Sequence, residues 1–117
     1  MRSGRLASER YFNGDSIDTL HDVRSATKSI TSLLMGIAIQ KGLVHGVNDS
    51  IALYLQGLPR DGKEKIRIKD LLNMRSGLDA NDEDLSTPGN EDNLDKSSDW
   101  IHTIYIVPMK GMSLIHI

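Results

Sequence analysis

The strongest pattern in this sequence is an apolar stripe at helical spacing. The stripe is formed by Ile30, Leu33, Leu34, Ile37 and Ala38. This spacing predicts an amphipathic helix over residues 25–41, with Gly42 placed to end it in a left-handed cap. Met35 and Ile39 widen the stripe, so we expect this helix to be buried on most of its sides.

Evidence for strands is weaker and limited to two segments. Residues 5–12 alternate imperfectly between apolar and polar side chains, and they predict one N-terminal strand. Ile66 and Ile68 flank Arg67 and predict a short extended segment. A strand at 5–12 without neighbours would present an unpaired edge, so we expect it to favour self-association of the chain.

Capping residues predict three shorter helices. One follows the run Asn-Asp-Ser at residues 48–50, a second starts at Asp70 and stops before Gly77, and a third starts near residues 97–99. The intervening residues 79–99 contain eight acidic side chains and one basic side chain, and we interpret them as a solvated acidic loop.

The acidic loop does not have the spacing of a calcium-binding loop. Asp84 occupies the place of the required Gly, and Asn90 occupies the place of the bidentate Glu. The four histidines have no metal-ligand spacing, and the chain contains no cysteine. The sequence therefore predicts no metal site.

Length, charge and hydropathy narrow the classes of function. The 117 residues correspond to about one domain, and 14 basic against 16 acidic side chains give a net charge of −2. We therefore expect no nucleic-acid partner and no membrane partner. The N-terminus has no apolar segment typical of a secretory signal. The chain as it stands predicts a cytoplasmic location, and a periplasmic or secreted one if an upstream segment was lost.

Candidate chemistry lies at the start of the predicted helix, where Ser25-Ala-Thr-Lys28 has the form Ser-x-x-Lys. Residues three apart on a helix lie on the same side, so the Lys28 amine can reach the Ser25 hydroxyl. A serine needs such a base, because its free hydroxyl is a poor nucleophile. The free N–H groups of the first helical turn are candidates to stabilise an oxyanion. On spacing alone, the alternative is that Ser25 caps the helix and Lys28 is solvated.

The surrounding sequence favours the catalytic interpretation. The run HDVRSATKSITSLL at residues 21–34 resembles the nucleophile helix of the serine β-lactamase-like family, in its branch of class C β-lactamases, esterases and penicillin-binding proteins. The resemblance continues at residues 36–38, 41–42, 48–50, 54–55 and 66–78, and it spans about residues 5–105. It implies an α/β (α+β) fold with Ser25 as the acyl acceptor and Lys28 as its base. Implied substrates are small esters, amides or β-lactams, with no cofactor.

The sequence also departs from this family. The family's later Tyr-x-Asn or Ser-x-Asn element, and its Lys-Thr-Gly-like strand, are not found after Gly77, and residues 106–117 form an atypical tail. We therefore expect 1–117 to be a single incomplete domain, mainly helical, whose C-terminal sheet strands are missing. The expected function is that of a truncated serine hydrolase with weak or no turnover. The alternatives are a non-catalytic remnant and a penicillin-binding module that acylates without turnover.

Overall fold

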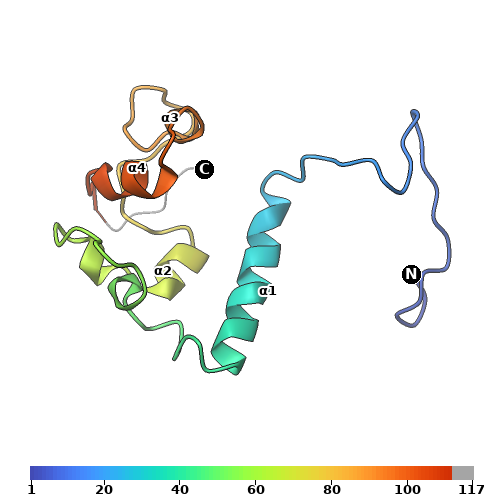
Figure 1. Cartoon of the computed structure of the whole chain (residues 1–117), viewed down its shortest axis with the longest axis horizontal. Coiled ribbons are helices and arrows are strands. Elements are labelled where there is room, and N and C mark those ends of the chain that lie inside the picture. Colours follow the sequence, from blue (N-terminus) through green and yellow to red (C-terminus); the bar gives the residue numbers. More distant parts are fainter. Residues whose placement is uncertain (112–117) are drawn as a thin grey trace. The chain divides into compact units, whose positions relative to one another are not determined.

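The computed structural model describes residues 1–111 (Figure 1). The chain forms two compact units, and the boundary between them falls within the longest helix. One compact unit is Met1–Thr31, and the second begins at Ser32. The α-helices are α1 (Ala26–Gln40), α2 (Ile68–Leu72), α3 (Glu91–Asp95) and α4 (Trp100–Ile106). Two single-turn 3₁₀ helices, η1 (Ile51–Leu53) and η2 (Lys63–Lys65), lie between α1 and α2.

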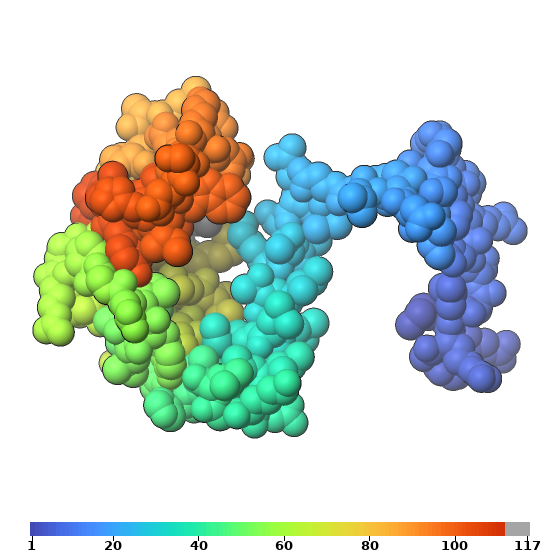
Figure 2. Space-filling model, viewed as in Figure 1, coloured from blue at the N-terminus to red at the C-terminus, as the bar shows by residue number. Residues whose placement is uncertain are grey.

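The first unit has no buried residue. Every side chain from Met1 to Thr31 is exposed, and the narrow blue chain in Figure 2 shows no packed layer. The predicted strand at 5–12 is wrong, because only Arg5 pairs, through an isolated bridge to Arg2 across a tight turn. A strand needs a neighbour to satisfy its backbone groups, and this segment has none. The expected self-association was based on the edge of this strand, so it no longer has that support, and it stays an untested prediction.

Helix α1 forms where the apolar spacing predicts it, but it is not buried on most sides. None of its residues is buried, and the predicted stripe from Ile30 to Ile37 is exposed, with Leu33 71% exposed. Of the predicted apolar positions, Ala38 and the two that widen the stripe, Met35 and Ile39, are half-buried. Met35 packs against the core of the second unit. Periodicity located the helix but did not predict which of its apolar residues are covered.

The core of the second unit is small and consists of isoleucines. Ile51, Ile66 and Ile68 are buried, and Met35, Val44, Leu58 and Met109 pack around them. The Ile51 N–H donates to the Ile66 carbonyl at 3.0 Å, beside a bridge between Ser50 and Arg67. The predicted extended segment at Ile66–Ile68 is thus correct in its alternation, because both isoleucines are buried and Arg67 is exposed.

Helix α2 begins two residues earlier than the sequence predicted. The Asp70 carboxylate accepts the Arg67 N–H at 2.9 Å, so Asp70 caps the helix from its third position instead of starting it. After α2, Gly77 has a φ of 74° and turns the chain into a short pairing with Met109 through Leu78. A Cβ on Gly77 would lie 2.9 Å from the Gly111 carbonyl oxygen, so this close approach requires glycine.

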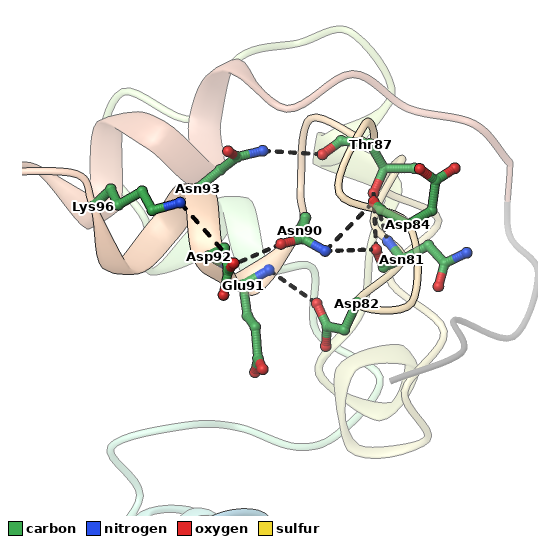
Figure 3. A network of polar contacts seen from close by, with 9 residues as sticks. All are labelled: Asn81, Asp82, Asp84, Thr87, Asn90, Glu91, Asp92, Asn93 and Lys96. Carbon is green, nitrogen blue, oxygen red and sulfur yellow. Dashed lines mark hydrogen bonds and ion pairs between the residues drawn. The ribbon is translucent and has the colours of Figure 1, made fainter.

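The acidic segment is more ordered than the predicted solvated loop. Asn90 is 1% exposed, and its side-chain amide donates to the carbonyls of Asn81 and Asp84 at 3.0 and 3.4 Å (Figure 3). Its side-chain oxygen accepts the Asp92 N–H and starts α3, a helix the sequence did not predict. The amide therefore sits where the loop carbonyls converge.

The predicted third helix is confirmed as α4. The Asp99 carboxylate caps it by accepting the His102 N–H at 2.9 Å. The Tyr105 hydroxyl donates to the Gln56 carbonyl at 3.1 Å and connects α4 to the loop after η1. Leu78, Ala80, Leu94 and Ile104 contribute to a small, largely apolar pocket of about 50 Å³ between α3, α4 and the preceding loop.

The chain is mainly helical, as predicted. Residues 1–111 contain isolated bridges in place of strands, so the α/β part of the predicted fold class is not confirmed. The single incomplete domain stays a prediction beside the two compact units. Of the predicted atypical tail, Met109 to Gly111 pair with residues 77–78, and residues 112–117 lie outside the described part of the chain.

Candidate functional site

Ser25 and Lys28 lie together at the start of α1. The Lys28 Nζ donates to the Ser25 Oγ at 3.2 Å. The bond exists because Ser25 directly precedes the first helical residue and Lys28 lies in the first turn, one turn further along the same side. The pair therefore has the distance that proton transfer between a nucleophile and its base requires.

The residue before Ser25 has an unusual backbone conformation. Arg24 has a φ of 47°, in the left-handed region that asparagine, aspartate and glycine adopt more readily than arginine. Asp22 contacts it twice: Oδ1 accepts the Arg24 N–H at 2.9 Å, and Oδ2 lies 2.9 Å from the Arg24 Nε. Sequence reasoning missed both residues, because neither spacing nor composition distinguishes them.

The N–H groups of the first turn do not serve as free oxyanion donors, contrary to the sequence-based expectation. The N–H groups of Ala26, Thr27 and Lys28 each donate to the carbonyl three residues earlier, at 3.0 Å. Within residues 1–111, the Ser25 N–H has no recorded acceptor. The tight first turn thus leaves the nucleophile's own N–H as the available donor.

Solvent reaches both candidate side chains. Ser25 and Lys28 are exposed, as is every other residue of the unit Met1–Thr31. The shielding that a serine–lysine site needs for efficient proton transfer is therefore not supplied by this unit.

A second cluster of titratable side chains joins the connector between α1 and η1 to Tyr54, the residue after η1. The Tyr54 hydroxyl donates to the Asp49 Oδ2 at 2.5 Å, and the His45 Nδ1 lies 3.2 Å from the same oxygen. The bond from Tyr54 lowers the pKa of Asp49, with a smaller contribution from His45. The same bond raises the pKa of Tyr54. Because the His45 N–H also donates to the Tyr54 hydroxyl at 3.2 Å, the cluster holds the connector to η1 in place.

A buried cation occurs at η2. Lys63 is 1% exposed, and its Nζ donates to the Asp61 Oδ2 at 2.6 Å. This hydrogen bond lowers the pKa of the Asp61 carboxyl. Across residues 1–111, no group of three His, Asp or Glu side chains is arranged to hold a metal ion, and no helix is long and apolar enough to cross a membrane.

Comparison with protein families identifies the family to which the chain belongs. The beta-lactamase family model matches residues 1–106, nearly the whole chain. The protein therefore belongs to the beta-lactamase family, a family of serine-hydrolase type. The resemblance drawn from the residues around Ser25 is confirmed at the level of the family. Searches of curated proteins and of solved structures gave no match.

Proposed function

We propose that this protein forms an acyl-enzyme on Ser25, with Lys28 as the base. The single observation that carries the proposal is the 3.2 Å bond from the Lys28 Nζ to the Ser25 Oγ, found in a chain of the beta-lactamase family. The expected substrates are small esters, amides and β-lactams.

The reaction begins with attack of the Ser25 Oγ on the substrate carbonyl carbon. The hydroxyl proton passes to the Lys28 Nζ, which then gives it to the ester alcohol, the amine or the opened β-lactam nitrogen as the bond from that group to the carbonyl carbon breaks. The Ser25 N–H is the donor available for the negative charge on the carbonyl oxygen. Water then hydrolyses the acyl ester and regenerates the serine.

We expect acylation to exceed turnover in this chain. Hydrolysis of an acyl-enzyme requires an activated water and a shielded oxyanion, and the exposed pair provides neither within its own unit. A stable penicilloyl adduct is the expected product with a penicillin-type probe. The second candidate function, besides hydrolysis, is therefore penicillin binding without turnover.

Intact-mass measurement after incubation with penicillin-type and activated-ester probes tests the proposal. We expect one adduct per chain, located on Ser25 by peptide mapping, and loss of the adduct in Ser25→Ala and Lys28→Ala. Ser29→Ala, which changes a neighbouring exposed serine of α1, is the matched control and should be labelled like the wild type. Product release in excess of protein indicates a hydrolase. The absence of any adduct would show a non-catalytic remnant and end the proposal.

A further inference from the structure

The conformation of Arg24 has a structural consequence for Ser25. Arg24 and Ser25 share one planar trans peptide, whose carbonyl and N–H point in opposite directions. The Arg24 carbonyl points into the helix, where it accepts the Thr27 N–H at 3.0 Å. The Ser25 N–H is therefore directed away from the first turn.

The left-handed conformation of Arg24, its φ and ψ taken together, orients this peptide plane relative to the preceding chain, and arginine does not favour that conformation. Of the four non-glycine residues with a positive φ, Asn13 is of a type that tolerates this region, whereas Arg24 is not. Strain of this kind persists only where neighbouring contacts stabilise it. Within residues 1–111, the recorded side-chain contacts of Arg24 and of its N–H are both made to the Asp22 carboxylate.

We propose that Asp22 is a positioning residue that holds Arg24 in the left-handed conformation and so orients the Ser25 N–H toward the oxyanion. This inference rests on the proposed acylation of Ser25. Asp22 touches neither Ser25 nor Lys28, and it acts through the backbone of Arg24. Its loss therefore slows the acylation step, while the binding of the probe, which precedes any oxyanion, is hardly changed.

Acylation kinetics separate the rate of the acylation step from the binding of the probe. We measure the adduct mass against time over a range of penicillin-type probe concentrations, which gives a maximal acylation rate and a half-saturating concentration. For Asp22→Ala we expect a maximal rate lower by on the order of 5- to 30-fold and a nearly unchanged half-saturating concentration. Asp22→Asn keeps an oxygen that accepts the Arg24 N–H, so its maximal acylation rate should lie between those of the wild type and Asp22→Ala. Asp15→Ala, which removes an exposed aspartate paired with His21, is the matched control and should acylate like the wild type.

A rescue variant distinguishes positioning from a general loss of structure. Glycine adopts a positive φ without strain, so Arg24→Gly added to Asp22→Ala should recover most of the lost rate. A double variant as slow as Asp22→Ala, or an Asp22→Ala variant as fast as the wild type, overturns the inference.

If the probe does not label the wild type, the proposed acylation of Ser25 is wrong. The role of Asp22 in holding Arg24 can still be tested by a second measurement. The backbone chemical shifts and the three-bond N–H to Hα coupling of Arg24 report its φ in solution. We expect the positive φ in the wild type and its loss in Asp22→Ala. A positive φ that persists in Asp22→Ala shows that Asp22 does not hold this conformation and overturns the inference.

Discussion

The two units differ in what holds them together. In Met1–Thr31 all residues are exposed, and hydrogen bonds and ion pairs join residues no more than six positions apart. From Ser32 onward, contacts connect distant segments, such as Tyr105 with Gln56 and Leu78 with Met109. The candidate site lies in the first unit, and the core lies in the second. Local hydrogen bonds thus suffice to align Ser25 with Lys28, but a shielded site needs the kind of packing found only in the second unit.

The largest expected difference between the units concerns side-chain truncation. Ile66 is 1% exposed, so Ile66→Ala should destabilise the second unit by about 3 kcal/mol, through lost burial and the cavity it leaves. Leu20 is 96% exposed, and Leu20→Ala should leave the unfolding midpoint unchanged. Urea unfolding followed by the fluorescence of the single tryptophan, Trp100, measures both.

Should Ile66→Ala not fold at all, Ile66→Val provides a milder version, with an expected cost of about 1 kcal/mol. Equal sensitivity at Leu20 and Ile66 would contradict the contrast between the units, because it would mean that residues 1–31 contribute to the cooperative core.

Two glycines with a positive φ give the next comparison. Gly77→Ala should cost about 2 kcal/mol, because the new Cβ meets the Gly111 carbonyl and alanine disfavours a φ of 74°. Gly14 has a φ of 86° with open space around it, and Gly14→Ala should leave the unfolding midpoint of the second unit unchanged. The same urea experiment reports both. A neutral Gly77→Ala would show that the pairing of residues 77–78 with the chain near Met109 is dispensable.

Asn90 tests whether the acidic segment belongs to the folded unit. Asn90→Ala removes one of the donors to the carbonyls of Asn81 and Asp84 and the acceptor of the Asp92 N–H, and we expect a loss of about 1.5 kcal/mol. Glu83→Ala changes an exposed side chain of the same segment and is the control. If both variants unfold like the wild type, the segment is the solvated loop that its composition predicts.

The smallest effect concerns pH and the bond between Tyr54 and Asp49. Because this bond lowers the pKa of Asp49, its stabilisation is present above the unfolded pKa of about 3.9 and is lost as pH falls through the folded value. Because it raises the pKa of Tyr54, the stabilisation is present below about 10 and is lost as pH rises through the folded value. The stability difference between wild type and Tyr54→Phe should therefore be constant between these limits and shrink beyond both.

Tyr11 provides the matched control for this pH profile. Its hydroxyl donates to Glu9, and this bond raises the pKa of Tyr11 in the unit without a core. Tyr11→Phe should leave the urea midpoint at every pH as in the wild type. A pH-dependent change in that variant would mean that the first unit is coupled to the unfolding of the second.

Sequence patterns predicted correctly the features that depend on neighbours within one or two helical turns. Apolar spacing located α1, Asp99 located the start of α4, and the three-residue interval predicted the bond between Ser25 and Lys28. These features follow from the geometry of a single helix, so no distant contact can alter them greatly.

Which surfaces are buried and which backbone angles are strained could not be predicted from the sequence, because both depend on contacts between segments. The sequence predicted α1 as buried on most of its sides, but Ile30, Leu33, Leu34 and Ile37 are exposed, and of the helix residues Met35 packs against the isoleucine core. Burial depends on which segments meet, and a period of 3.6 residues does not specify the partner. The left-handed conformation of Arg24 could likewise not be predicted from the sequence, because it depends on the carboxylate of Asp22 and not on the preference of arginine.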